Sequence, residues 1–174
     1  MLYSPVFFSK LEPDSNSYIN YDPVRTTLYP IIIDLLEKNN EKNFHNLIFF
    51  QTVFLLISII FLIFSLKTLN VNFFFLIIIF SLIFFNFYYT SFAKVILTEA
   101  IFFGFLNFSF GLIFFKKYLF ESKILCLLFG FFIGGVIAIK SIGILVALLL
   151  FCVLIKRDFY KNKKYILITL IGAT

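Results

Sequence analysis

The chain has 174 residues, of which 61% are hydrophobic, 22% aromatic and only 14% charged. A water-soluble domain is about 45–50% apolar and about 25% charged, so this composition excludes an ordinary soluble enzyme. The net charge of +6 comes from basic residues that fall between apolar runs, which indicates membrane topology rather than nucleic-acid binding. We therefore expect an all-α integral membrane protein that binds no nucleic acid.

The first 45 residues contain the only long polar segment, which is punctuated by Pro13, Pro23 and Pro30. Met1 to Phe8 is too short to cross a bilayer, which needs about 20 apolar residues. From residue 26 to about 39 the apolar side chains recur at helical spacing, which predicts a short amphipathic helix in the membrane interface. Its apolar face is expected to contain Leu28, Ile31, Ile32, Leu35 and Leu36.

Apolar runs then follow one another to the end of the chain. Each should be a helix, because an unpaired backbone group in hydrocarbon costs several kcal/mol and the runs lack the alternation of a barrel. We expect about five complete transmembrane helices and the start of a sixth, in a single transmembrane domain (1–174) with an external segment (1–45) and a bundle (46–174). The runs are Leu47–Leu66, Val71–Tyr89, Ala100–Phe115, Ile124–Ile139, Ile142–Ile155 and Tyr165 to the end.

The charges between successive runs predict the orientation. One side collects nine basic and two acidic residues: Lys67, Lys116, Lys117, Lys123, Lys156, Arg157, Lys161, Lys163 and Lys164, with Glu121 and Asp158. The other side collects six basic and seven acidic residues: Lys10, Arg25, Lys38, Lys42, Lys94 and Lys140, with Glu12, Asp14, Asp22, Asp34, Glu37, Glu41 and Glu99. Because positive charge is retained inside, the first side is predicted to be cytoplasmic and the polar N-terminal segment external.

Asp14 is the first candidate for chemistry on the external side. It stands between Pro13 and Ser15, where a turn or a helix cap is favoured. One interpretation is a cap for a turn that carries Tyr18. The other is a carboxylate at the bilayer surface that acts as a general base or binds a divalent cation.

Four further ionisable residues are predicted to share the external side. Arg25 precedes the amphipathic helix and either binds a phosphate or makes a plain headgroup contact or a pair with Asp22. Glu99 begins an apolar run, where a carboxylate either caps the helix or faces a cavity. Lys94 lies about one turn earlier, where it either pairs with Glu99 or faces the same cavity. Lys140 occupies a tight turn between two short runs, either as part of a site or as a snorkelling lysine.

Other chemistries lack their motifs. The sequence has no glycine-rich phosphate loop and no Cys/His zinc spacing, so soluble nucleotide-using enzymes and zinc sites are not indicated. His45 stands alone at the start of an apolar run, and Cys126 and Cys152 lie within apolar runs as small hydrophobes. None of the three predicts a metal centre.

The order of these segments resembles the GT-C membrane glycosyltransferases, in particular the bacterial family-39 type, which is related to protein O-mannosyltransferases and lipid A aminoarabinose transferases. The resemblance extends over nearly the whole chain and rests on four short stretches spread along it: residues 13–19 (PDSNSYI), 25–30 (RTTLYP), 97–99 (LTE) and 140–143 (KSIG). The Asp14 stretch matches the acidic first external loop of that family, and Thr98-Glu99 is similar to its Thr-Glu pair.

The resemblance implies sugar transfer from a polyprenyl-phosphate donor to a lipid, glycan or protein acceptor, with inversion, on the outer face of a bacterial inner membrane. It assigns Asp14 as the general base and Arg25 or Lys140 to the departing phosphate. Glu99 would orient the acceptor or share a divalent cation (Mg²⁺ or Mn²⁺) with Asp14, and Tyr18 and Lys94 would contact substrate.

The family normally has a transmembrane helix before the acidic loop and more spans after these, so we expect the chain to be a fragment of a longer protein. Two other functions stay open on the sequence. A small transporter or flippase subunit would line a path with polar side chains, and the candidates within the runs are Ser58, Ser81, Asn86 and Asn107. A non-catalytic membrane scaffold is the third.

Overall fold

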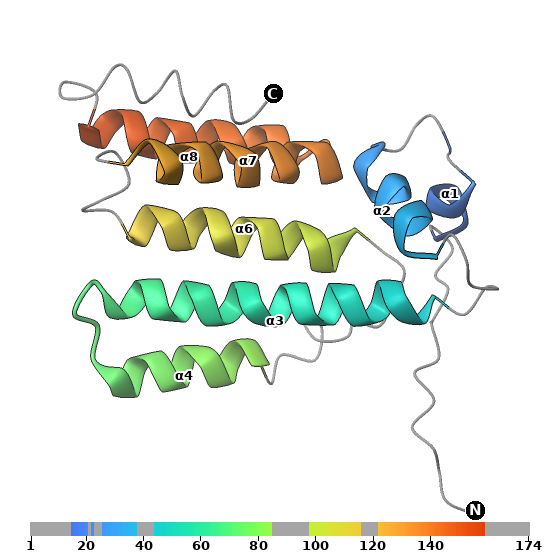
Figure 1. The fold of residues 1–174 in the computed structure, drawn as a ribbon. Helices are drawn as coiled ribbons and strands as arrows, with labels where there is room; N and C mark the ends of the chain where they lie inside the picture. Colours follow the sequence, from blue (N-terminus) through green and yellow to red (C-terminus); the bar gives the residue numbers. More distant parts are fainter. Residues whose placement is uncertain are drawn as a thin grey trace, which may run out of the picture.

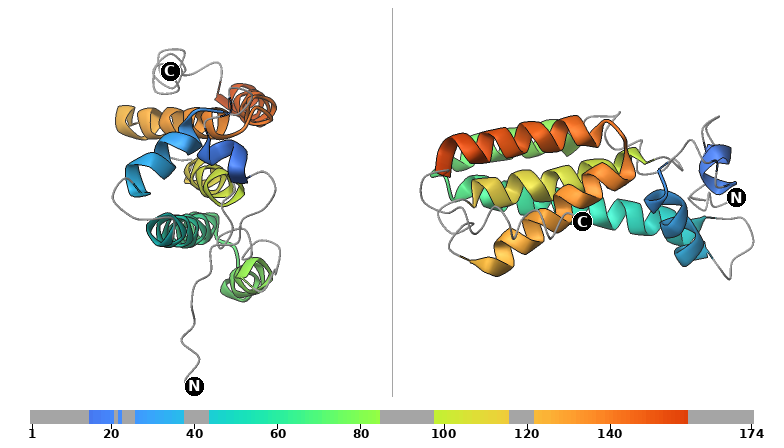
Figure 2. Two further views of the ribbon diagram at one scale, coloured as in Figure 1. Left: turned by 90° about the vertical axis from the view of Figure 1, so that its right-hand side faces the viewer. Right: turned by 90° about the horizontal axis from the view of Figure 1, so that it is seen from above.

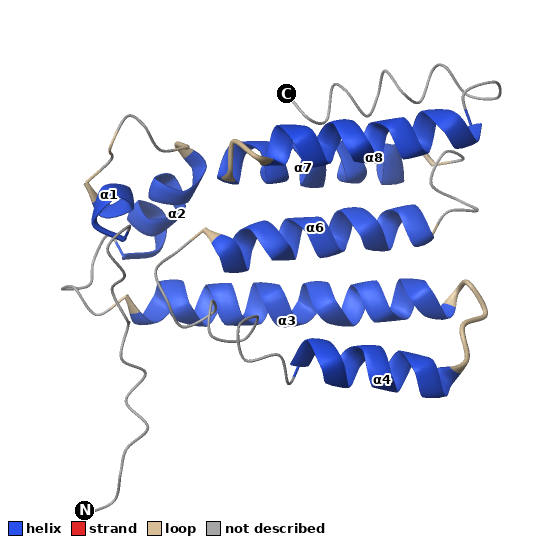
Figure 3. Cartoon of the chain, turned by 180° about the vertical axis from the view of Figure 1, so that it is seen from behind, coloured by secondary structure: helices blue, strands red, loops and turns tan. Residues whose placement is uncertain are grey.

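A computed structural model describes residues 15–20, 22, 26–37, 44–84, 98–115 and 122–158 of the chain. The described part is helical and contains no strand, as Figure 3 shows, which confirms the all-α prediction. Two short helices, α1 (Ser15–Ile19) and α2 (Leu28–Glu37), precede a stack of longer ones. These are α3 (His45–Lys67), α4 (Phe73–Phe84), α6 (Glu99–Phe114), α7 (Lys123–Ile139) and α8 (Gly143–Asp158).

The long helices run roughly side by side and alternate in direction where they follow one another (Figure 1). α3 lies between α4 and α6, and α7 and α8 cover the other side of α6. α7 crosses α6 obliquely, as the right-hand panel of Figure 2 shows. The start of α3, the start of α6 and the α7–α8 turn all lie at the end of the stack that carries α1 and α2.

Among the described helices one, α3, is long and apolar enough to cross a membrane by itself. Its 23 residues extend about 35 Å, against a hydrocarbon core of about 30 Å. The neighbouring helices are apolar but shorter: α6 and α8 have 16 residues each and α7 has 17. Large apolar side chains are exposed on α3, α4, α7 and α8, and surfaces of this kind mark membrane or protein contacts. The chain is therefore suited to association with a membrane.

The most extensive helix contact is that between α3 and α6, and it repeats every seven residues. Phe54 and Phe61 of α3 pack against Gly104 and Gly111 of α6, where a Cβ atom would collide with their rings. Residue numbers increase in the same direction along both helices from one contact to the next, so α3 and α6 run parallel. Close packing on small residues of this kind is also found between membrane helices. Gly135 of α7 receives Phe105 of α6 in the same way.

Polar side chains also repeat along the buried face of α3. Gln51, Ser58 and Ser65 are seven residues apart and fully buried. Ser58 accepts a hydrogen bond from Nδ2 of the buried Asn107 on α6, 3.1 Å away. Ser65 Oγ donates to the carbonyl of Phe61. Two of the polar residues that the transporter hypothesis places along a path thus bind each other between helices.

The predicted amphipathic helix is confirmed as α2, but its apolar face is divided. Tyr29 and Ile33 are buried against the bundle, whereas Ile31 and Leu35 are exposed. Hydropathy locates apolar side chains, but it does not separate those that meet protein from those that face outward. The exposed pair gives α2 an outward apolar surface beside the bundle end, as an interfacial helix requires.

Candidate functional site

An ion pair between Glu99 and Lys140 joins α6 to α7 at the α1–α2 end of the stack. Lys140 Nζ lies 2.6 Å from Glu99 Oε1, and the two side chains are 33% and 22% exposed, respectively. The pair is half-buried and open to the outside. Sequence analysis predicted that these residues share a side; their direct contact is an additional finding.

The helix ends favour this placement of the two charges. Glu99 is the first residue of α6 and Lys140 is the cap residue that follows α7. A carboxylate is stabilised near a helix N-terminus and an ammonium group near a C-terminus. The Lys140 backbone is extended, and its N–H donates to the carbonyl of Val136 at 3.4 Å. Each charge thus also complements the dipole of its own helix.

Lys140 is fixed by a second contact. Its Nζ atom lies 5.9 Å from the centroid of the Phe102 ring, one turn into α6, within the range of a cation–π interaction. An ammonium group has three N–H donors, and the bond to Glu99 occupies one of them. The remaining donors and the exposed part of the side chain give an anion access to the positive charge.

The turn after α7 holds the lysine in place. The Gly143 N–H donates to the Lys140 carbonyl at 2.8 Å, and α8 begins at this glycine. A Cβ atom at Gly143 would run into the backbone carbonyl of Val136, which cannot move aside as a side chain can. The predicted tight turn is confirmed, and its glycine is required for the close return of the chain.

A hydrogen bond from the residue segment before α2 to the end of α7 holds α2 close to the ion pair. Thr26 Oγ1 donates to the carbonyl of Ile139, the residue before Lys140, at 2.6 Å. Tyr18, Tyr29, Phe102 and Ile139 share one buried apolar cluster. The α2 helix therefore forms part of the same rim as the lysine.

A buried polar contact joins α2 to α3. Gln51 Nε2 donates to the Tyr29 hydroxyl at 2.6 Å, and both residues are fully buried. Burial raises the pKa of Tyr29 above its ordinary value; the bond from Gln51 acts in the opposite direction, and the charge on Glu99 adds to the increase. Tyr29 therefore stays protonated at physiological pH.

The start of α3 is capped from α2. Glu37 Oε1 accepts a hydrogen bond from the Leu47 N–H at 2.8 Å, and Asn46 Nδ2 donates to the Leu36 carbonyl at 3.3 Å. A carboxylate at this position satisfies a backbone donor of the first turn. Glu37, one of the acids on the predicted external side, thus has a structural role.

Tyr18, a predicted substrate contact, lies in the wall behind the ion pair. Its side chain is 5% exposed, and its ring packs edge-on against Tyr29 with the centroids 5.2 Å apart. The turn that carries it belongs to α1, which begins at Ser15. Tyr18 supports the rim through its ring.

Three predicted site residues, Asp14, Arg25 and Lys94, lie outside the described residues. Within the described ranges no group of three His, Cys, Asp or Glu side chains could hold a metal ion. Glu99 contributes one carboxylate, so the expected divalent-cation site would depend on Asp14. Its geometry stays a prediction.

The Tyr29–Gln51 contact and the buried polar repeat on α3 were not predicted from the sequence. The signal was available as a glutamine and two serines at intervals of seven within an apolar run. A seven-residue period places side chains on one face of packed helices. The partner residue on the other helix cannot be read from that period.

Comparison with known proteins identified no relative: no family model, curated protein or solved structure matches the chain.

Proposed function

We propose that the chain is the membrane part of a glycosyltransferase that takes a sugar from a polyprenyl-phosphate donor at the external face of a bacterial inner membrane. The proposal places α3, α4, α6, α7 and α8 across the bilayer, with α2 in the interface beside the ion pair. Its main support is Lys140, a cation that Glu99 and Phe102 hold at the rim of an apolar helix stack. This is the level at which the phosphate of a membrane-bound donor lies.

The helix stack supports the bilayer placement. All five long helices expose large apolar side chains, among them Phe73 on α4 and Leu145 on α8. α6, α7 and α8 extend about 24–26 Å and the described part of α4 about 18 Å, and α1 and α2 extend the protein beyond them at one end. Transfer of this apolar surface from water to lipid is favourable by about 25 cal/mol per Å².

In the proposed reaction the acceptor hydroxyl attacks the anomeric carbon of the sugar. The bond from that carbon to the phosphate oxygen breaks, and the polyprenyl phosphate leaves with the electron pair. Asp14 accepts the hydroxyl proton, and Lys140, together with Arg25, stabilises the charge that develops on the leaving phosphate. Attack from the face opposite the phosphate inverts the anomeric configuration.

Glu99 has two roles in this proposal. In the absence of donor it neutralises Lys140 and keeps its side chain in one orientation. When the lipid phosphate binds, it competes for the ammonium group, and the carboxylate becomes available to the acceptor or to a cation shared with Asp14. The Glu99–Lys140 bond is thus the contact that the donor would replace.

The transporter hypothesis has less support. Ser58 and Asn107 are buried and hydrogen-bonded to each other, so their polar atoms contribute to helix packing. The charged pair lies at one end of the stack rather than along it. Both observations favour a site at the rim over a polar path between the helices.

Transfer assays test this function. Membranes that contain the full chain are incubated with radiolabelled polyprenyl-phosphate monosaccharides, and the release of polyprenyl phosphate and the product anomer are measured. We expect inverted product, a loss of at least about 100-fold for Asp14→Asn, and normal amounts of protein in the membrane. Lys123→Met, which removes an exposed lysine at the opposite end, should have no effect. Equal transfer by Asp14→Asn, or no turnover of any donor, would contradict the proposal.

A further inference from the structure

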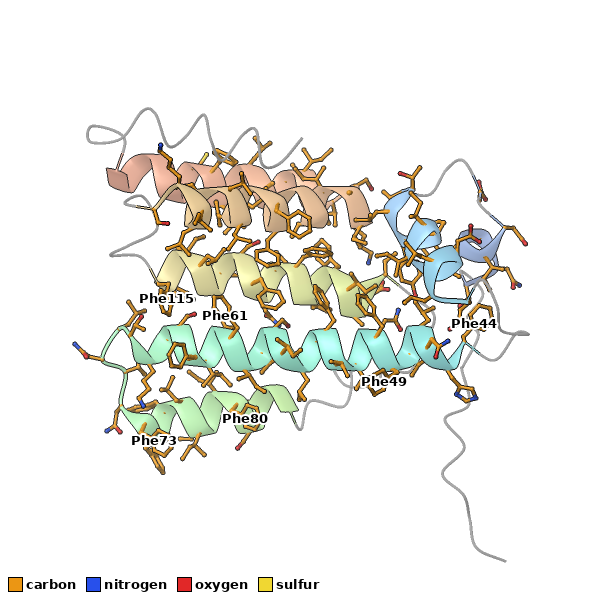
Figure 4. All side chains as sticks on the ribbon, viewed as in Figure 1. Phe44, Phe49, Phe61, Phe73, Phe80 and Phe115 are labelled. Carbon is orange, nitrogen blue, oxygen red and sulfur yellow. The ribbon has the colours of Figure 1, made fainter. Side chains whose placement is uncertain are left out.

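A second surface of interest is an apolar groove between α3 and α4, at the end of the stack opposite the ion pair. Its volume is about 370 Å³. The walls are the apolar side chains Ile60, Ile63 and Phe64 of α3 and Phe73, Leu76, Ile77 and Phe80 of α4, and one end is lined by Lys67. Figure 4 shows Phe73 at the α3–α4 turn and Phe80 farther along α4.

Among the described residues, Lys67 is the only charged one that lines this groove. It is exposed at the last position of α3, and within the described part of the chain no carboxylate pairs with it. The turn that follows is well defined: Thr68 Oγ1 donates to the Ser65 carbonyl at 2.6 Å, and Asn72 Oδ1 accepts from the Phe74 N–H at 3.1 Å. The groove thus combines a long apolar surface with one exposed cation at its mouth.

We propose that this groove binds an anionic phospholipid, with one acyl chain between α3 and α4 and the phosphate beside Lys67. The α3 side of the groove spans residues 60–67, a length of about 10 Å. One leaflet contributes about 15 Å of hydrocarbon, so the groove accommodates the part of an acyl chain nearest the headgroup. The length, the apolar walls and the position of the cation match a phospholipid that enters from its own leaflet.

The charge of this end of the stack favours an anionic lipid over a zwitterionic one. Lys67 and Lys123 are both exposed here, and charge counting assigns both to the cytoplasmic side, where anionic headgroups attract basic residues. The proposal depends on the bilayer placement of α3 and α4. It does not depend on sugar transfer, which is assigned to the other end.

The chain contains no tryptophan, so a single introduced indole reports on lipid contact. Phe73→Trp places the reporter in the groove, and Ile124→Trp places it beside Lys123 on α7; the native side chains are 67% and 72% exposed, so neither change disturbs a core. The full chain with either reporter is reconstituted in phosphatidylcholine vesicles. Phosphatidylglycerol or phosphatidylcholine with acyl chains brominated near the headgroup is then added in increasing fractions, and fluorescence quenching is measured.

At the groove reporter we expect brominated phosphatidylglycerol to bind about fivefold more tightly than brominated phosphatidylcholine, the preference that one lysine gives near an anionic surface. Lys67→Gln should remove the preference, while Lys123→Gln should leave it. The reporter at position 124 should show a smaller preference that Lys67→Gln does not alter. An Ile77→Trp reporter, farther along the groove, repeats the measurement if the first variant folds poorly.

Three results would overturn the proposal. Equal preferences at positions 73 and 124 would indicate general attraction to a basic surface rather than a site. A preference at position 73 that survives Lys67→Gln would show that this lysine does not hold the phosphate. Absence of quenching at both positions would refute the bilayer placement itself, whereas failure of sugar transfer with normal quenching would refute only the proposed enzyme function.

Discussion

Replacement of Tyr29 by phenylalanine tests whether the α2 helix is fixed to the bundle by its hydrogen bond to Gln51. The substitution removes only the hydroxyl that accepts from Gln51 Nε2 at 2.6 Å, and it keeps the aromatic ring that packs against Tyr18. A buried donor that loses its partner costs about 1–3 kcal/mol. We take about 2 kcal/mol, because both side chains are fully buried.

The assay is thermal unfolding of the purified full chain in detergent, followed by circular dichroism. For a chain of this size each kcal/mol corresponds to about 2–4 °C, so Tyr29→Phe should lower the melting temperature by about 4–8 °C. Replacement of both partners, Tyr29→Phe with Gln51→Leu, should recover most of the loss, because no buried donor is then left without its acceptor. A single variant that melts within about 1 °C of the natural chain would refute the reasoning.

Three further predictions concern packing, pH and placement in the membrane. Gly111→Ala should destabilise the chain by about 1–3 kcal/mol, because its Cβ would lie 2.6 Å from the Phe61 ring; added Phe61→Leu should restore thermal stability, and a single variant as stable as the natural chain would argue against the α3–α6 contact. Burial raises the pKa of Tyr29, so above about pH 10 the folded state retains a proton that the unfolded state loses, and this residue's contribution to stability falls by about 1.4 kcal/mol per pH unit. The free energy of unfolding of Tyr29→Phe should therefore decrease less between pH 10 and 11 than that of the natural chain. Identical decreases would exclude the effect. Cys152 has an exposed side chain on α8 whereas Cys126 is buried, yet both should resist a water-soluble maleimide in intact membranes and react after denaturation; rapid labelling of Cys152 in intact membranes would contradict the bilayer placement.

The sequence predicted the elements of this fold better than the contacts between them. The apolar runs that begin near residues 47, 100, 124 and 142 correspond to α3, α6, α7 and α8, whose bounds differ from the predicted ones by a few residues. The described helix in the second run ends at Phe84, and the rest of that run lies outside the described residues. Such runs predict helices, because an unpaired backbone group is costly in lipid and a helix pairs its own backbone groups.

The candidate site was predictable in part. Alternation of the runs placed Glu99 and Lys140 on one side, and the structure brings them into contact. Lys94 was the nearer candidate partner for Glu99 in the sequence. The contact with Lys140 depends on how α6 and α7 are rotated about their axes, which is set by the packing of Phe105 on Gly135 and is not encoded in hydropathy.

Direct binding of a polyprenyl phosphate tests the central claim that Lys140 receives the donor phosphate. Binding of the radiolabelled lipid to the reconstituted full chain is measured for Lys140→Met, Glu99→Gln and the control Lys123→Met. The Lys140→Met variant loses a charge-assisted hydrogen bond to the phosphate, so its affinity for the lipid should be about tenfold lower or more. Glu99→Gln should bind at least as tightly as the natural chain, because it releases Lys140 from its ion pair, and Lys123→Met should be unchanged. Equal binding by Lys140→Met and the natural chain would contradict the claim.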